Sequence, residues 1–244
     1  MTELLSIRIA RKGFAAQVVL ANLNLDIGRG QVVSLVGASG CGKSTLLRIV
    51  AGLEQEYRGE VRLAGRPVCG VSREIGFIFQ EPRLLPWLTV AQNVAFDIGR
   101  RSGVDPRAAE LIERVGLAGF AQALPKSLSG GMAQRTAIAR GLFSKPQLLL
   151  LDEPFSAVDA FTRMKLQDLL LDIARENDTT LLLVTHDIDE AIYLSDRVVI
   201  LSNHPGTIAA DIAIDMGKKR DRRSPELSVY RKTVLDALEA IHAI

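Results

Sequence analysis

The residues best suited to chemistry form the stretch GASGCGKST, which runs from Gly37 to Thr45. It matches the pattern G-x-x-x-x-G-K-[ST] and lies between an apolar segment, QVVSLVG, and a segment with helical spacing, KSTLLRIVAGL. In such a loop the glycines let backbone N–H groups close around nucleotide phosphates, Lys43 adds a positive charge, and the Ser44 hydroxyl can bind Mg²⁺. The residues expected to hold the nucleotide are Gly37, Ala38, Ser39, Gly40, Cys41, Gly42, Lys43, Ser44 and Thr45.

Two adjacent carboxylates follow an apolar run in LLLLDEP, residues 148–154. Ligands of open α/β sheets bind at the carboxyl ends of the strands, so Asp152 and Glu153 should face the phosphates. We expect Asp152 to bind Mg²⁺ and Glu153 to be the general base that polarises the attacking water. The alternative interpretation is that the pair only caps a helix where the strand ends.

Two further polar residues close apolar strands. His186 ends TLLLVTH, and Gln80 ends EIGFIFQ. At the same edge of the sheet, His186 would position the γ-phosphate or the water, and Gln80 would reach Mg²⁺ and that water. Each also has a structural interpretation, His186 as a hydrogen-bonding residue of the fold and Gln80 as an ordinary residue at a strand end.

A second glycine turn, SLSGGMAQR at Ser127 to Arg135, precedes another helical segment. By itself it indicates a serine N-cap followed by two permissive glycines, which is a common helix start. Ser129, Gly130 and Gly131 could also hold an anion at the helix N-terminus. A chain with a phosphate loop at residues 37–45 would then have two anion sites.

The segments around these motifs indicate an α/β fold. QLLLLDEP, TLLLVTH and DRVVILSN are apolar strands separated by helical segments, which is the pattern of a mostly parallel core sheet covered on both faces. Near the N-terminus, LLSIRIA, QVVL and LNLDI predict short strands of an antiparallel sheet, and GEVRLAG predicts an edge strand. After Gln80 the spacing predicts helices, one of them capped by Asp105 with Pro106 at its first position.

The whole chain is expected to form one domain. Its expected parts are a core with the antiparallel sheet over residues 1–80 and 136–215, an inserted α-helical subdomain over 81–135, and a basic linker with a final helix over 216–244. The basic run from Lys218 to Arg223 is interpreted as a solvated linker, and the alternative is contact with anionic lipid or a membrane partner.

Composition narrows the class of protein. A formal net charge of +2 gives no general attraction to nucleic acid, so we expect no nucleic-acid partner. The longest apolar runs fall far short of the roughly 18 residues of a membrane span, and no secretory signal opens the sequence. The two cysteines fit a reducing compartment. We therefore expect the chain to stay inside the cell.

Taken together, in this order and spacing, the motifs resemble those of the ATP-binding cassette family of transporter ATPases, whose fold is that of a P-loop NTPase. The correspondences are residues 37–45 with its Walker A loop, Gln80 with its Q-loop, LSGGM at 128–132 with its signature, LLLLDEP with its Walker B strand, SAVD at 156–159 with its D-loop, and His186 with its switch histidine. Phe14 falls where the family usually places an aromatic residue that stacks on adenine. The family more often has Gln at the position of Met132.

The resemblance implies an ATPase that binds ATP and Mg²⁺ and works as a dimer with a second copy of itself. In the family, the signature turn of one cassette caps the γ-phosphate held by the Walker A loop of the other. This explains two anion sites in one chain, with Ser129, Gly130, Gly131 and Asp159 contributing to shared nucleotide sites.

The stretches RLLPWLTV, EPFSAVDAFTR, LSNHPGT and KKRDRRSPEL are similar to importer ATPases of the nitrate, sulfonate and taurine group. That group also includes cassettes for pyrimidine-type vitamin precursors, so the similarity does not fix the substrate. That similarity implies integral membrane permease subunits and an extracytoplasmic solute-binding protein as partners, and a peripheral location at the cytoplasmic face of the inner membrane. Trp87 lies in the first of these stretches. It either packs into the helical subdomain or belongs to a loop that receives a helix of the permease.

Two other functions stay open at this point. One is a soluble cassette ATPase of translation or DNA repair, a class that usually carries tandem cassettes or a long coiled-coil insertion, neither of which the sequence shows. The other is a monomeric P-loop kinase, in which the second glycine turn would have no role.

Overall fold

The structure is a computed structural model of the 244-residue chain, and it describes residues 2–15, 17–98, 104–217 and 220–241. The chain forms two compact units, one made of residues 1–72 and 180–244 and the other of residues 73–179. The subdomain borders expected at residues 81 and 135 fall within the second unit, and the expected division stays a prediction.

The first unit contains an antiparallel sheet with the strand order β2-β1-β4-β5. Its strands are β1 (Glu3–Phe14), β2 (Gln17–Gly28), β4 (Arg58–Leu63) and β5 (Arg66–Pro67). Leu5, Ile7 and Ile9 are buried along β1 while Arg8 is exposed, as the two-residue period of a half-buried strand requires. Two expectations were wrong in detail: QVVL and LNLDI form the single strand β2, and β4 pairs with β1 and β5 instead of forming an edge.

The first unit also contains the parallel strands that carry the phosphate loop. β3 (Val32–Val36) pairs in parallel with β8 (Thr180–Val184) and with β9 (Arg197–Leu201), and β10 (Ile208–Ala213) runs antiparallel to β9. Every residue of β3 and β8 is buried, which explains their continuous apolar sequences. The helices of this unit are α1 (Lys43–Val50), α6 (Ile188–Leu194) and α7 (Glu226–Ala240).

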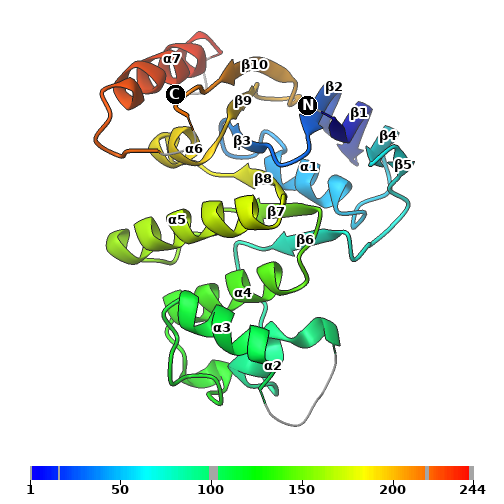
Figure 1. The fold of residues 1–244 in the computed structure, drawn as a ribbon. Helices are drawn as coiled ribbons and strands as arrows, with labels where there is room; N and C mark the ends of the chain where they lie inside the picture. Colours follow the sequence, from blue (N-terminus) through cyan, green and yellow to red (C-terminus); the bar gives the residue numbers. More distant parts are fainter. Residues whose placement is uncertain (1, 16, 99–103, 218–219, 242–244) are drawn as a thin grey trace. The chain divides into compact units, whose positions relative to one another are not determined.

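The second unit pairs two parallel strands, β6 (Ile75–Ile78) and β7 (Leu148–Asp152). Its helices are α2 (Val90–Val94), α3 (Pro106–Arg114), α4 (Gly130–Phe143) and α5 (Ala160–Glu176), with 3₁₀ turns at Phe96–Ile98 and Pro125–Ser127 (Figure 1). Asp105 caps α3 by accepting the N–H groups of Arg107 and Ala108, as predicted. Helices α2, α3 and α4 pack against one another.

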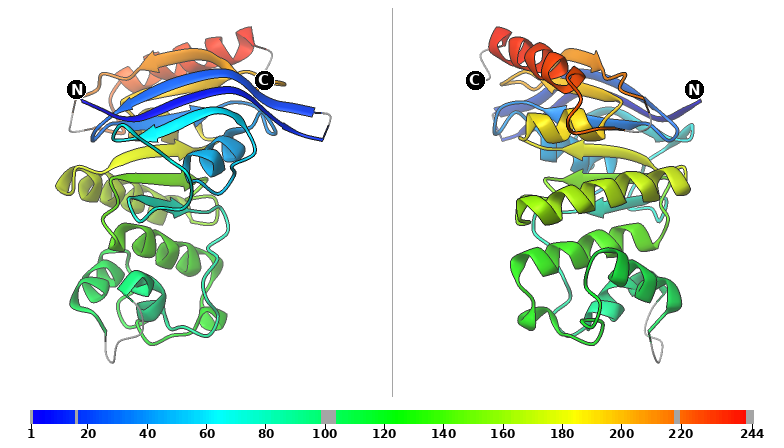
Figure 2. Two further views of the ribbon diagram at one scale, coloured as in Figure 1. Left: turned by 90° about the vertical axis from the view of Figure 1, so that its right-hand side faces the viewer. Right: turned by 60° about the vertical axis from the view of Figure 1, so that its left-hand side comes forward.

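The C-terminal segment is part of the first unit and packs within it. Helix α7 lies on α6 and β9, as the right-hand view of Figure 2 shows for the helices. It buries Val234 and Leu238 in an apolar cluster with residues of those elements. The Arg220 side chain is only 3% exposed and pairs with Asp196 at 2.9 Å. The guanidinium of Arg222 lies over the Tyr193 ring. The expectation of a solvated linker is therefore wrong at these two arginines, because α6 and Asp196 just after it supply partners that a linear sequence does not show. Lys218 and Lys219 of the same run lie outside the described residues.

Trp87 is 65% exposed, so the interpretation that this side chain packs into the helical subdomain is also wrong. Among the described residues, no helix combines the length and apolar character that crossing a membrane needs.

Candidate nucleotide site

The phosphate loop of the first unit joins the end of β3 to the start of α1. The helix begins at Lys43 with Gly42 as its N-cap, and Gly42 adopts the left-handed conformation with φ of 103°. A Cβ atom at Gly42 would lie 2.6 Å from Leu20 Cδ2, and one at Gly37 would lie 2.6 Å from the Leu201 carbonyl oxygen. Glycine is thus required at both positions, which fits the spacing read from the sequence.

Lys43 is held inside this loop. Its Nζ donates to the carbonyl oxygens of Gly37 at 2.8 Å and Ala38 at 2.9 Å, and Cys41 Sγ lies 3.8 Å away. The Lys43 side chain is buried even though it carries a charged ammonium group. The backbone of the loop therefore surrounds the positive charge of Lys43. A bound phosphate group would replace the two carbonyl oxygens as the hydrogen-bond partners of this ammonium.

The register of two neighbouring strands brings His186 to the edge of the sheet that carries the loop. Leu35 of β3 pairs with Val184 of β8, and these strands are parallel. Gly37 and His186 each follow two residues later, so both lie beyond the carboxyl ends of adjacent strands. His186 is exposed, and Asp187 next to it caps α6 by accepting the N–H of Glu190. The predicted placement of His186 at a strand end is confirmed.

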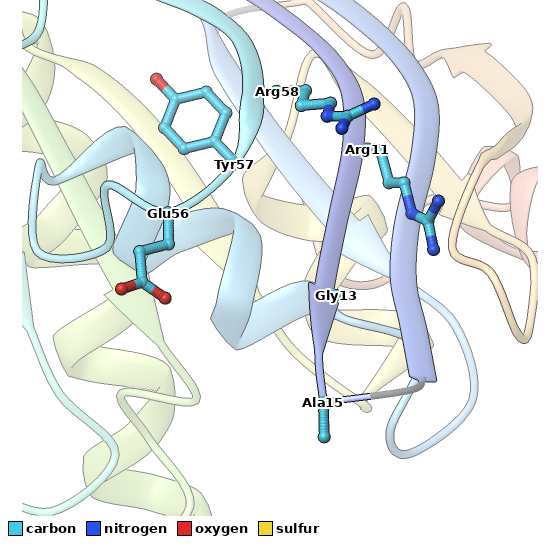
Figure 3. Close-up of a pocket in the computed structure, with 6 residues that line it drawn as sticks. All are labelled: Arg11, Gly13, Ala15, Glu56, Tyr57 and Arg58. Atoms are coloured by element: carbon cyan, nitrogen blue, oxygen red, sulfur yellow. The ribbon is translucent and has the colours of Figure 1, made fainter.

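Phe14 closes β1 and is 48% exposed. The Lys12 ammonium lies 4.2 Å from the centroid of the Phe14 ring. The residues on either side of Phe14 line an open hollow of about 430 Å³, shown in Figure 3. Its lining residues are Arg11, Gly13, Ala15, Glu56, Tyr57 and Arg58. Phe14 is not one of these lining residues, so its suitability as a platform for a planar base rests on the exposure of its ring.

The second unit brings Gln80 and Glu153 together. Their strands pair in parallel with Ile78 opposite Leu151, and each side chain follows two residues after that pair. Gln80 Nε2 donates to Glu153 Oε2 at 3.2 Å. Asp152, at the end of β7, is 7% exposed, and the Glu153 backbone has φ of 45°, which is uncommon for a residue with a side chain.

The second glycine turn is the N-terminus of α4. Ser129 is the N-cap, and its hydroxyl oxygen accepts the backbone N–H of Met132 at 3.2 Å. Met132 contributes only its backbone N–H to this cap. Having Met where the family more often has Gln therefore leaves the cap unchanged. The N–H groups of Gly130 and Gly131 belong to the first turn and have no acceptor within the helix. The turn thus has the geometry of an anion site as well as that of a cap.

Asp159 is likewise an exposed N-cap, here of α5. Its carboxylate accepts the N–H of Thr162 at 3.0 Å, and this backbone hydrogen bond lowers the pKa of Asp159 below its ordinary value.

Two residues that the sequence did not single out hold the chain on both sides of Gln80. Gln134 of α4 donates to the carbonyl oxygen of Phe79 at 3.3 Å. Arg140, further along the same helix, donates to the carbonyls of Pro82 at 2.8 Å and Arg83 at 2.9 Å. Burial lowers the pKa of Arg140. The helix that starts at Ser129 therefore also anchors the segment that carries Gln80.

The donor chemistry fits a magnesium nucleotide. Mg²⁺ takes oxygen ligands and is usually bound through one or two protein groups together with substrate phosphates. The Ser44 hydroxyl in the first unit and the Asp152 carboxylate in the second are such groups. In the described part of the chain, no cluster of three or more His, Cys, Asp or Glu side chains could hold a metal ion.

Comparison with known proteins gives consistent results. A family model described as "ABC transporter" matches residues 20–156. The aliphatic sulfonates import ATP-binding protein SsuB 2 of Burkholderia cenocepacia is 55% identical over 98% of this chain and 88% of its own length. SsuB 1 of Pseudomonas savastanoi pv. phaseolicola is 57% identical over 99% of each chain. A dimeric post-hydrolysis structure of the ATP-binding cassette MJ0796, bound to ADP and Pi, is 32% identical with a TM-score of 0.77 and covers 86% of this chain and 98% of its own.

Proposed function

The chain belongs to the ABC transporter family and is an ATPase, and from this premise we propose that it is the ATP-hydrolysing subunit of an importer for aliphatic sulfonates. The observation that carries the substrate class is the identity of 55% and 57%, over 98% and 99% of the chain, to proteins named for aliphatic sulfonate import. The soluble cassette of translation or DNA repair gains no support from these relatives, and the kinase interpretation leaves the Ser129 turn without a role.

In this proposal the first unit binds the phosphates of ATP. The backbone N–H groups of the loop and the positive end of α1 attract the β- and γ-phosphates, and Lys43 exchanges its contacts with the Gly37 and Ala38 carbonyls for phosphate oxygens. The ring of Phe14 offers its exposed face to adenine. His186, at the same sheet edge, positions the γ-phosphate or the water that attacks it.

The second unit provides the groups that act on water. Glu153 accepts a proton from the attacking water, and the amide of Gln80 fixes one oxygen of that carboxylate. Asp152 and the Ser44 hydroxyl would hold Mg²⁺. When bound, this ion neutralises the charge that develops on the phosphate oxygens. The remaining task of the chain is to hold Glu153 at its strand end, which the pairing of β6 with β7 does.

A second copy of the chain completes each site. Ser129, Gly130 and Gly131 present unpaired helix N-terminal donors, and Asp159 caps a helix close by in the sequence. We assign these groups to the γ-phosphate held by the partner copy, so that ATP joins the two copies and hydrolysis weakens the joint. The dimeric arrangement of the related cassette MJ0796 supports this assignment.

The remaining partners follow from the importer assignment. The ATPase would sit at the cytoplasmic face of the membrane, bound to permease subunits that receive the solute from an extracytoplasmic binding protein. Trp87 is exposed and lies seven residues after Gln80. A permease helix that contacts Trp87 would therefore touch this chain only a short distance along the sequence from Gln80.

The experiment begins with the Glu153→Gln variant, tagged and purified with ATP from gently solubilised membranes. The proposal expects a permease and a solute-binding protein to accompany it. The wild-type complex is then placed in liposomes with the binding protein, and uptake of labelled ethanesulfonate is measured against uptake of sulfate. ATP-dependent uptake of the sulfonate alone supports the proposal.

Two controls separate the parts of this proposal. Glu153→Gln should abolish uptake while the complex stays assembled. Uptake of a different solute by the wild-type complex would overturn the sulfonate assignment and leave the ATPase assignment standing. Recovery of ribosomes or nucleic acid without a permease would overturn the importer assignment itself.

A further inference from the structure

We propose that Lys12 is a positioning residue for the nucleotide base, because its buried ammonium holds the inner face of Phe14 and leaves the outer face for adenine. The inference rests on the proposed ATP site and deepens it, since it concerns how the platform for the base is built.

The surroundings of Lys12 are unusual for a lysine. Its side chain is 1% exposed, although it lies near the tip of a hairpin. The ammonium lies 3.0 Å from Glu54 Oε1 and donates to the Glu56 carbonyl oxygen at 2.8 Å. Buried charges are normally paired in this way, so Lys12 has a fixed place and not a range of solvated positions. Its third neighbour is the ring of Phe14, whose centroid lies 4.2 Å away.

This distance is well inside the range of a cation–π contact, which extends to about 6 Å. The contact occupies one face of the ring, and Phe14 is still 48% exposed. The ring is therefore held on one side and accessible on the other, which is the arrangement that a stacking platform needs. A phenylalanine without such a support would lose side-chain freedom on binding the base.

The backbone around Phe14 helps to aim it. The pairing of β1 with β2 shifts register between Lys12 and Gly13, and such irregularities redirect side chains. A Cβ atom at Gly13 would lie 2.8 Å from the Gln17 carbonyl oxygen, so the hairpin closes tightly at this point. Lys12 and Phe14 lie on either side of this shift in register, and their side chains contact each other.

Glu54 connects the platform to the phosphate loop. The N–H groups of Leu53 and Glu54 donate to the Arg48 carbonyl, in the last turn of α1. The same helix begins at Lys43, the residue expected to bind the phosphates. The ion pair of Lys12 with Glu54 thus joins the base platform to the helix that carries the phosphate loop. A fixed spacing between the two would lower the entropy cost of binding the whole nucleotide.

The test compares two ligands that share phosphates but differ in the base. ATP carries adenine, whereas inorganic tripolyphosphate carries none. Lys12→Met should weaken ATP binding and raise the KM for ATP about three- to tenfold, with kcat unchanged, and should leave the Kd for tripolyphosphate unchanged. Lys12→Arg, which keeps a cation over the ring, should restore most of the ATP affinity.

A cycle with Phe14 separates this role from a merely structural one. Phe14→Ala should weaken ATP binding, and Lys12→Met should have no further effect in that background, because the ring on which it acts is gone. If the two effects simply add, or if Lys12→Met weakens both ligands equally, the inference is overturned. It is also overturned if Phe14→Ala binds ATP like the wild type, and in that case the proposed ATPase function still stands.

Folding is controlled with the double variant Lys12→Met and Glu54→Gln, which leaves no unpaired carboxylate beside the ring. It should melt in one cooperative transition, at a lower temperature than the wild type because the ion pair is gone, and show the same loss of ATP affinity as Lys12→Met alone. A wild-type protein that binds neither ATP nor tripolyphosphate would contradict the proposed function, an outcome distinct from failure of the Lys12 inference. A double variant that binds ATP as tightly as the wild type would overturn the inference.

Discussion

The side-chain amide of Gln80 donates to Glu153 Oε2 at 3.2 Å, so the polar residues that close two neighbouring strands are joined. The parallel pairing of β6 with β7 brings them to the same edge, and Gln134 and Arg140 anchor the backbone on either side of Gln80. A movement of the loop that follows Gln80 would therefore also move the Glu153 carboxylate, which is expected to activate water. If the permease binds near Trp87 as proposed, this contact would connect its docking site to the carboxylate proposed to act on water.

The first prediction concerns Glu153→Gln. The new amide oxygen can still accept from Gln80, so the local structure should be kept, while the general base is lost. We expect ATP hydrolysis to fall by about 10² to 10⁴-fold, the usual contribution of such a base. ATP binding should be unchanged or tighter. Steady-state phosphate release and nucleotide binding measure the two effects, and hydrolysis at a normal rate would remove Glu153 from this role.

A second prediction concerns Arg140→Met. The carbonyls of Pro82 and Arg83 would lose a partly buried charged donor, which should destabilise the protein by about 1–3 kcal/mol. The rate of hydrolysis should also fall, because the segment that carries Gln80 is loosened. Urea unfolding and ATPase assays measure both. Lys126→Met is the control, because it removes an exposed positive charge elsewhere in the same unit, so a loss as large as that of Arg140→Met would contradict this explanation.

Much of the site could be predicted because its motifs are local. The loop from Gly37 to Thr45 needs only a strand before it and a helix after it, and both are visible as apolar and helical spacing. His186 and Gln80 were found by a simple rule, since polar residues that end apolar strands in an α/β fold lie at the ligand-binding edge. The structure confirms that each lies just beyond the end of its strand.

The rest depends on contacts between residues that are distant in sequence. Arg140 is 57 and 58 residues from the carbonyls to which it donates, and nothing in its own helix indicates these contacts. One signal in the sequence does point to Lys12. It precedes Phe14 by two residues, and residues two apart on a strand share a face of the sheet. The basic run near the C-terminus was assigned to solvent because its partners Asp196 and Tyr193 lie more than twenty residues earlier.

The third prediction follows from that correction. Arg220 donates to Asp196 Oδ1 at 2.9 Å and to the Ile192 carbonyl at 3.1 Å, and Asp196 accepts the Val32 N–H through its other oxygen. Arg220→Gln should lower the free energy of unfolding by about 1–3 kcal/mol. Arg223→Gln is the control, because that side chain is 91% exposed and should change stability by less than about 0.5 kcal/mol. Equal denaturant midpoints for the two variants would argue against a buried role for Arg220.

A fourth prediction concerns two like charges on the antiparallel sheet. Arg11 of β1 is directly opposite Arg58 of β4, and in the described part of the chain neither has a carboxylate partner, whereas Arg8 pairs with Asp26 at 2.6 Å. Arg58→Glu should stabilise the protein by roughly 0.2–1 kcal/mol by converting repulsion into attraction. The gain should shrink as salt is added, and Arg58→Gln should give a smaller gain. Thermal melts at two ionic strengths test this, and a loss of stability in low salt would refute it.

The last prediction concerns acid stability and the ion pair beneath Phe14. The hydrogen bond from the Lys12 side chain lowers the pKa of Glu54 below its ordinary value of 4.5. Because the folded state binds this proton less readily than the unfolded state, the pair's contribution is complete above about pH 4.5 and is lost as the pH falls through the lower folded pKa. Glu54→Gln should therefore be less stable than the wild type at pH 7, and its stability should fall less steeply below pH 4.5. Urea midpoints between pH 3 and pH 7 measure the slope, with Glu113→Gln, an exposed residue of α3, as the control that should follow the wild type. An acid slope in Glu54→Gln as steep as that of the wild type would mean that the carboxylate contributes nothing to the folded hairpin, and Lys12 would then be held by the Glu56 carbonyl and the Phe14 ring alone.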